Sequence, residues 1–145
     1  KATLAGEAYA IHVTSVGTVR ASSSPGNNDR AILHVAPGSR DTFRASPERA
    51  RLTGDAYSIR VKGFRRVNAR SGKGDDDQAF LHDSALDDTL EAGAGWARVS
   101  NDDAQSGFSI RASGFELVKA RSSNDGDVAD VDPATLDWLL ARGWV

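Results

Sequence analysis

Apolar and polar residues alternate along most of the chain. Tyr57, Ile59 and Val61 take every second position, with Ser58 and Arg60 between them. A period of two is typical of a β-strand with one buried face, because successive side chains point to opposite sides. The alternating runs are separated by segments rich in Ser, Gly, Asn and Asp, which favour turns, at 22–29, 71–77 and 122–127. The pattern therefore predicts an all-β protein.

The alternating pattern occurs three times. With an offset of about 48 residues, Ala50 aligns with Ala2 and, towards the C-terminus, with Ala97. The turn segments and the apolar positions on either side of them follow the same offset. We therefore predict a single domain of three repeats, at 1–49, 50–96 and 97–131, followed by a C-terminal cap at 132–145.

Two architectures fit three repeats of short strands. A parallel β-solenoid stacks equivalent residues of successive repeats, and a β-trefoil closes three repeats around a threefold axis. The solenoid explains why small residues recur at one position, as at Ala2, Ala50 and Ala97. It also explains a terminal cap, which a closed trefoil does not need. The sequence favours the parallel solenoid and keeps the trefoil as the alternative.

The C-terminal segment departs from the repeat. Asp132 suits a helix N-cap, and Leu136, Leu139 and Leu140 would share one face of a short helix. We predict that this helix, with Trp144 folding back on it, covers the open end of the stack. The N-terminal repeat starts at once and has no comparable cap. This asymmetry predicts self-association, or contact with further repeats, through the uncapped N-terminal end.

Composition narrows the choice of partners only slightly. The 145 residues carry a formal net charge of −2, which gives no reason to expect nucleic acid as a partner. There is no cysteine, and no apolar run approaches the roughly 18 residues of a membrane-spanning helix. The chain also lacks methionine, including at its start, which favours a fragment of a longer protein.

The repeat motif resembles a known kind of extracellular array. The stretch DDDQAFLHDSALDDTLEAG at 75–93, with GF-x-x-V-x-A at 63–69 and 114–120, resembles repeats in large secreted or surface proteins of planctomycete-like bacteria. The first repeat departs from this motif, with Val35 and Ala36 in the places of Asp83 and Ser84. The resemblance implies an extracellular β-solenoid in a secreted or cell-surface protein, and a structural role more than an activity.

The aspartates in the turns suggest two alternative roles. Asp75, Asp76 and Asp77 form the best single calcium candidate, since carboxylate oxygens are ligands of Ca²⁺. The simpler interpretation is that turn aspartates accept hydrogen bonds from backbone N–H groups, as Asp and Asn commonly do. We favour the second interpretation and keep calcium as a possible cofactor.

No catalytic constellation stands out in one repeat against the others. Trp96, which aligns with Arg49 of the first repeat, is an aromatic residue without an equivalent there and is a candidate carbohydrate contact. We therefore expect a non-catalytic structural or assembly module, such as a stalk, spacer or self-associating surface element. A carbohydrate-binding module is the alternative, and a polysaccharide-active β-helix enzyme ranks third.

Overall fold

A computed structural model describes residues 1–6, 10–13, 17–24, 28–72, 75–135 and 137–145. Over these ranges the chain forms two β-sheets, which we call sheet A and sheet B. Sheet A holds β1 (Ala2–Ala5), β2 (Ala10–Val13), β4 (Arg30–His34), β8 (Arg66–Arg70), β10 (Thr89–Gly93), β11 (Trp96–Asn101), β12 (Phe108–Ser113) and β14 (Val128–Val131). Sheet B holds β3 (Thr18–Ser22), β5 (Thr42–Ser46), β6 (Arg49–Thr53), β7 (Ser58–Lys62), β9 (Gln78–His82), β13 (Leu117–Arg121) and β15 (Leu139–Arg142). The predicted all-β class is confirmed.

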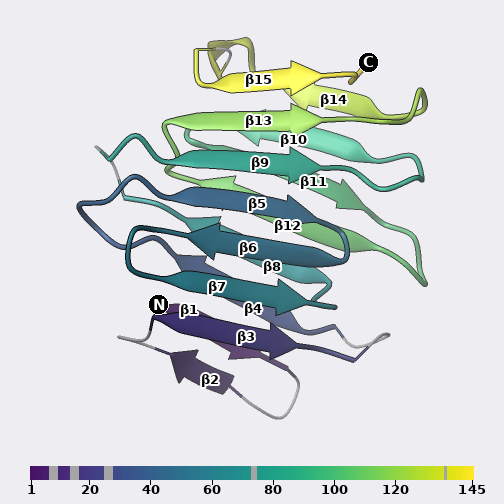
Figure 1. Cartoon of the computed structure of the whole chain (residues 1–145). Helices are drawn as coiled ribbons and strands as arrows, with labels where there is room; N and C mark the ends of the chain where they lie inside the picture. Colours follow the sequence, from purple (N-terminus) through teal and green to yellow (C-terminus); the bar gives the residue numbers. More distant parts are fainter. Residues whose placement is uncertain (7–9, 14–16, 25–27, 73–74, 136) are drawn as a thin grey trace.

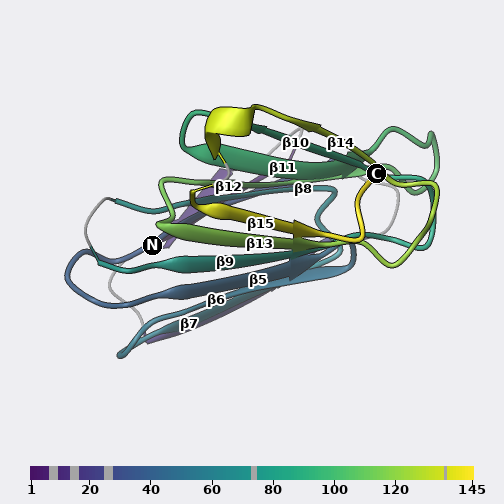
Figure 2. The ribbon, with the colours of Figure 1, turned by 90° about the horizontal axis from the view of Figure 1, so that it is seen from above.

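The two sheets lie face to face as two layers (Figure 2). Sheet A runs in the order β14-β10-β11-β12-β8-β4-β1-β2, and sheet B in the order β15-β13-β9-β5-β6-β7-β3. Both sheets therefore begin with C-terminal strands at one end and finish with N-terminal strands at the other (Figure 1). The layered stack has two different ends, one at β14 and β15 and the other at β2 and β3.

The core lies between the two layers and follows the alternation in the sequence. In β5, Phe43 and Ala45 are buried while Arg44 between them is exposed. Rows of inward side chains run across each sheet, such as the neighbouring Phe43, Leu52 and Ile59 of sheet B. Such rows bury apolar area from both layers, which is the main favourable term in folding.

Strand pairing is mixed, which corrects the prediction of a parallel solenoid. Three-stranded antiparallel meanders, β5-β6-β7 in sheet B and β10-β11-β12 in sheet A, alternate with strands that cross between the sheets. The crossing strands pair in parallel, as β4 does with β8 and β9 with β13. Period-two alternation is common to both kinds of pairing, so it does not distinguish them.

Successive repeats change sheets, because three connections in each period of five strands cross between the layers. The strands β5 to β9 occupy sheets B, B, B, A and B, and the next five, β10 to β14, occupy A, A, A, B and A. Equivalent residues therefore lie in opposite layers: Ala50 is in sheet B, whereas Ala2 and Ala97 are in sheet A on strands that are not neighbours. The predicted stacking of these three alanines is wrong. Unlike residues stack instead, as Leu33 does with Ala69.

The C-terminal segment forms a strand where a helix was predicted. Asp132 does accept a hydrogen bond from the N–H of Ala134, but the helical part is the single 3₁₀ turn η1 (Pro133–Thr135). Leu139 is then buried in β15, which pairs in parallel with β13, while Leu140 is 55% exposed. Leu136 lies outside the described residues. Among those described, no helix has the length and apolar content to cross a membrane.

Trp144 is partly buried against the core, and the element before it is a strand, not the predicted helix. Beyond β15, the N–H of Ala129 donates to the carbonyl of Val145, which ties the chain end to β14. The C-terminal end of the stack is thus covered by β15, η1 and the last residues, seen near the C label in Figure 1.

Candidate functional site

The outer face of sheet B carries charge of one sign. The seven described strands of this sheet contain no acidic residue. They hold nine of the chain's 18 lysine and arginine residues: Arg20, Arg44, Arg49, Arg51, Arg60, Lys62, Lys119, Arg121 and Arg142. The near-neutral chain therefore has a strongly basic face.

Four arginines of this face form a row across neighbouring strands, which we call the arginine row. Arg20 of β3 pairs with Arg60 of β7, Arg60 with Arg51 of β6, and Arg51 with Arg44 of β5. All four side chains are exposed. Neighbouring strands lie about 4.8 Å apart, so the row extends over roughly 14 Å. Like charges directly opposite each other on adjacent strands are unfavourable, and the row contains three such pairs.

No carboxylate of the described residues neutralises the arginine row. Among the described residues, none of its four guanidinium groups takes part in an ion pair. The repeat offers a direct comparison, since Glu91, Arg98 and Arg111 of sheet A stand where sheet B has Arg44, Arg51 and Arg60. There, Arg98 forms a salt bridge with Glu91, and Arg111 stacks on Trp96 at 4.3 Å from the ring centroid. Of the two meanders, only the one in sheet B therefore has outward arginines, Arg51 and Arg60, without a carboxylate or aromatic partner among the described residues, while Arg44 lies over Phe80.

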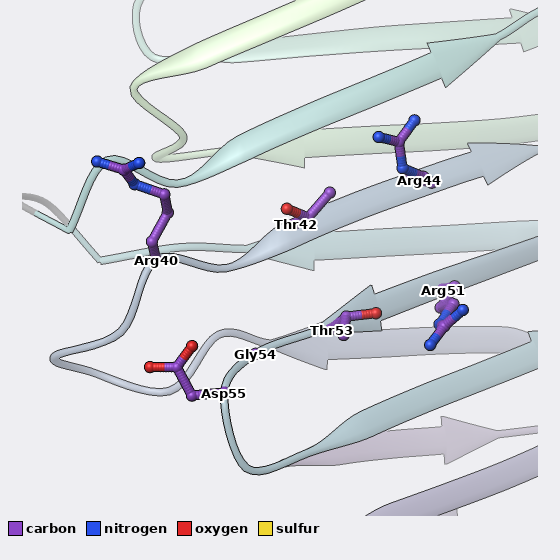
Figure 3. Close-up of a pocket in the computed structure, with 7 residues that line it drawn as sticks. All are labelled: Arg40, Thr42, Arg44, Arg51, Thr53, Gly54 and Asp55. Atoms are coloured by element: carbon purple, nitrogen blue, oxygen red, sulfur yellow. The ribbon is translucent and has the colours of Figure 1, made fainter.

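The arginine row borders two hollows in the surface. One, of about 1020 Å³, is lined by Arg20, Arg44, Arg51 and Arg60 together with Lys62 and other residues. The second, of about 380 Å³, adjoins Arg44 and Arg51 and continues towards Arg40 (Figure 3). In Figure 3 the side chains of Thr42 and Thr53 lie beside these arginines, and Asp55 stands at the margin.

These groups are suited to an extended anion. A guanidinium group presents a planar fork of donors that matches carboxylate, sulfate or phosphate oxygens. The paired hydroxyls of Thr42 and Thr53 can donate to, or accept from, sugar-type hydroxyl groups. Arg44 lies over Phe80 with its guanidinium carbon 4.0 Å from the ring centroid. That contact fixes the Arg44 side chain at one end of the row.

Trp96, the carbohydrate contact predicted from the sequence, lies on sheet A, away from the arginine row. Its indole covers Gly93, where a Cβ would come 3.0 Å from Nε1, and Arg111 stacks on the ring. The side chain is half-buried. Both ring contacts are made within the protein, which agrees with packing on the neighbouring turn more than with an open platform.

The predicted calcium residues Asp75, Asp76 and Asp77 do not converge. Asp75 accepts a hydrogen bond from the N–H of Gly38, and Asp76 pairs with Arg40 at 2.9 Å. Asp77 is fully buried and accepts from the N–H of Asp41 at 2.7 Å. The three carboxylates therefore serve three separate contacts across the loops.

Buried aspartates secure the loops that cross between the sheets, as the simpler interpretation predicted. Asp41 accepts from the N–H of Ala36, from Ser39 and, at 2.8 Å, from the hydroxyl of Tyr57. Burial raises the pKa of Asp41 above its ordinary value, while these donors oppose the rise. Burial also raises the pKa of Tyr57, and its hydrogen bond to Asp41 adds to the effect.

Sequence reasoning missed the arginine row, although a signal was present. Arginine greatly outnumbers lysine, and Arg44, Arg51 and Arg60 all occupy outward positions of the alternation. The overall charge of −2 concealed them, because the acidic residues that the structure describes lie in loops and on sheet A. Comparison with known proteins offers no independent identification: no family model, curated protein or solved structure matches this chain.

Proposed function

We propose that this chain is a non-catalytic module that binds an acidic polysaccharide along the arginine row. The observation that carries the proposal is the row itself, four adjacent exposed arginines without a carboxylate partner among the described residues. An anionic polymer laid across the strands would relieve their mutual repulsion. This is the alternative function that the sequence left open, transferred from Trp96 to sheet B.

A sugar acid suits the face better than a nucleic acid does. Proteins that bind single strands without sequence preference stack successive bases on aromatic side chains. In the strands of sheet B the one aromatic residue on the outer face is Phe80, and Arg44 already covers it. Hydroxyl and guanidinium donors predominate instead, which suits carboxylate and hydroxyl groups. A secreted or cell-surface location, where such polymers occur, is part of the proposal.

Binding to polygalacturonate, followed by calorimetry at several salt concentrations, tests the proposal. The double variant Arg51→Gln/Arg60→Gln should weaken binding at least tenfold. It should also reduce the slope of log K against log salt by about 1.5, because each cation–anion pair on the polymer accounts for roughly 0.7–0.9 of that slope. The matched control is Arg30→Gln/Arg66→Gln, since these arginines are also exposed and paired on neighbouring strands, but on sheet A. The control should bind like the unchanged protein.

Two results would contradict this function. The first is equal weakening by both double variants, which would make the binding a non-specific effect of charge. The second is tighter binding of single-stranded DNA than of polygalacturonate at equal charge, which would assign the row to nucleic acid. Pullulan, a neutral polysaccharide, should bind neither the unchanged protein nor either double variant.

We also propose that the chain assembles through its N-terminal end as one segment of a longer β-solenoid-like stack. The observation that favours this second role is the pair of edges there: β2 pairs only with β1, and β3 only with β7, among the described strands. Ile11 on β2 is 51% exposed. Unpaired strand edges are templates for pairing with another chain. Sedimentation at increasing concentration should show association, and a strictly monomeric chain would refute it.

A further inference from the structure

Three carboxylates meet where the chain crosses between the sheets near the C-terminal end. Asp83 and Asp88 lie between β9 and β10, and Asp127 lies just before β14. Each contributes an oxygen, and the three oxygens lie within 4.8 Å of one another. Asp88 and Asp127 are buried, and Asp83 is half-buried. Among the described residues, no other group of this kind is found.

One carboxylate oxygen of Asp127 is buried without a partner. Oδ1 of Asp127 accepts from the N–H of Asp88 at 2.8 Å, but Oδ2 accepts no hydrogen bond from any described residue. The Asp127 side chain is 0% exposed, so water does not reach it from outside. A buried polar atom without a partner is costly and calls for an unseen ligand or ion.

The preceding repeat shows how the same position is satisfied without an ion. There Asp77 stands in the place of Asp127, and its Oδ2 accepts from the hydroxyl of Ser71. The corresponding Ser122 instead donates to the carbonyl of Asn124, at 3.0 Å. Ser71 also has a carbonyl within reach, that of Gly72, so the difference between the two sites is that Oδ2 of Asp127 has no hydrogen-bond partner among the described residues.

Two substitutions between the repeats change the surroundings of these carboxylates. Asp41 accepts from the hydroxyl of Tyr57, whereas its counterpart Asp88 has Phe108 at that position, which offers no hydroxyl. Where the earlier copy has the apolar Val35, the later one has Asp83. The later site has thus lost the tyrosine hydroxyl and gained a negative charge.

We propose that Asp83, Asp88 and Asp127 form a binding site for one Ca²⁺ ion. Calcium takes six to eight oxygen ligands at about 2.3–2.6 Å, so two oxygens on one ion lie at most about 5 Å apart. The three oxygens lie within 4.8 Å of one another, which is compatible with this geometry. Mg²⁺ demands near-ideal octahedral coordination, whereas Ca²⁺ accepts irregular coordination, so carboxylates fixed by the fold suit Ca²⁺ better. Backbone carbonyls and water would complete the coordination.

The site differs in place and purpose from the arginine row. It joins the loop after β9 to the segment before β14, so a bound ion would fasten the last crossing between the sheets. Asp88 also accepts hydrogen bonds from the N–H and the hydroxyl of Ser84, which orient its carboxylate. These hydrogen bonds hold one ligand in place before the ion arrives.

Calorimetric titration of Ca²⁺ into the full chain, after removal of metals with EDTA, tests the proposal. One ion should bind per chain, and 1 mM Ca²⁺ should raise the melting temperature by several degrees. Asp83→Val restores the residue found in the earlier repeat, and it should weaken binding at least tenfold while keeping the fold. Asp83→Asn is a second variant with a smaller change in shape. Asp76→Asn, which removes an exposed acid outside the cluster, is the matched control and should bind normally.

Several results would overturn the calcium site. Absence of both heat and thermal shift would mean that Asp83 and Asp127 share a proton instead of an ion. Equal affinity in Asp83→Val and the unchanged protein would place the ion elsewhere. Mg²⁺ binding as tight as Ca²⁺ binding would refute the assignment to calcium. Circular dichroism distinguishes a variant that fails to fold from one that fails to bind.

Discussion

The buried carboxylate of Asp77 offers a sharp test of how the crossings between the sheets are held. Its Oδ1 accepts the N–H of Asp41, which is itself fully buried, and its Oδ2 accepts the hydroxyl of Ser71. In Asp77→Ala the N–H of Asp41 loses its partner where water cannot replace it. Ser71 has an alternative acceptor, the carbonyl of Gly72 at 2.7 Å, so its loss matters less.

The expected loss of stability follows from these hydrogen bonds. A hydrogen bond to a charged group contributes about 1.5–3 kcal/mol, and an unsatisfied buried donor costs about 1–3 kcal/mol. Removing the buried charge itself recovers part of this, because a buried ion is poorly solvated. We therefore expect Asp77→Ala to lower the free energy of unfolding by about 3 kcal/mol, which for a chain of this size corresponds to roughly 10 °C in Tm.

Urea unfolding followed by tryptophan fluorescence measures this change. Trp96, Trp138 and Trp144 are all half-buried and report on the packed state. The matched variant Asp77→Asn keeps an acceptor for the N–H of Asp41, and it should lose no more than about 1 kcal/mol. A loss below about 0.5 kcal/mol in Asp77→Ala would refute the reasoning, since that is the range of neutral surface changes. Equal losses in both variants would assign the effect to charge and not to the hydrogen bond.

Three further predictions concern the same crossings. Tyr57→Phe removes the hydroxyl from Asp41 and should lower the free energy of unfolding in urea by about 1–2 kcal/mol; no change would mean that the hydroxyl is not needed. Gly114→Ala should cost about 3 kcal/mol in the same assay, because φ is 77° and a Cβ would lie 2.3 Å from the carbonyl oxygen of Ser71. Gly38→Ala, with φ of 81° but no atom within 4 Å, should cost only about 1 kcal/mol, and equal costs would rule out the clash. Because burial raises the pKa of Asp41 above 3.8, the unchanged protein should lose stability relative to Asp41→Asn as pH rises from about 4 to 7. The stabilising contribution of the protonated acid is complete below the unfolded-state pKa and disappears above the folded-state pKa, so a constant difference across this range would contradict the shift.

The alternation in the sequence was enough to find the strands and the buried positions. The period of two predicts that Ile59 and Val61 share the buried face of one strand, and both are buried. The sequence did not determine which sheet each strand joins. A strand that turns back in a meander and one that crosses to the other layer have the same alternation. Only the long-range pairing separates the two, and a single chain read alone does not show it.

The C-terminal segment shows how tertiary pairing overrides a local pattern. The spacing of Leu136, Leu139 and Leu140 fits one face of a helix, yet Leu139 and Leu140 lie in a strand. The edge of β13 has backbone groups that need partners, and β15 supplies them through a parallel ladder. Local helical preference is weak by comparison.

The candidate sites were only partly accessible from the sequence. Turn aspartates were correctly assigned to backbone hydrogen bonds, as at Asp77 and Asp88. Three arginines of the row come from the consecutive strands β5, β6 and β7, but Arg20 joins them only through the parallel pairing of β3 with β7. The meeting of Asp83 with Asp127 needed the parallel pairing of β10 with β14. Both arrangements depend on pairing between residues far apart in the chain.

The odd number of layer crossings in each repeat has a consequence for any longer stack of such units. Three connections between β5 and β10 cross from one layer to the other, and an odd number of crossings leaves the next copy in the opposite layer, so consecutive copies are related by a half-turn about the long axis. The outer faces of equivalent meanders would then alternate between the two sides of the stack. A polymer bound along one side would contact the equivalent face of every second copy. Insertion of one extra copy between β9 and β10 would turn everything after it to the other side. Insertion of two copies would leave the original orientation unchanged.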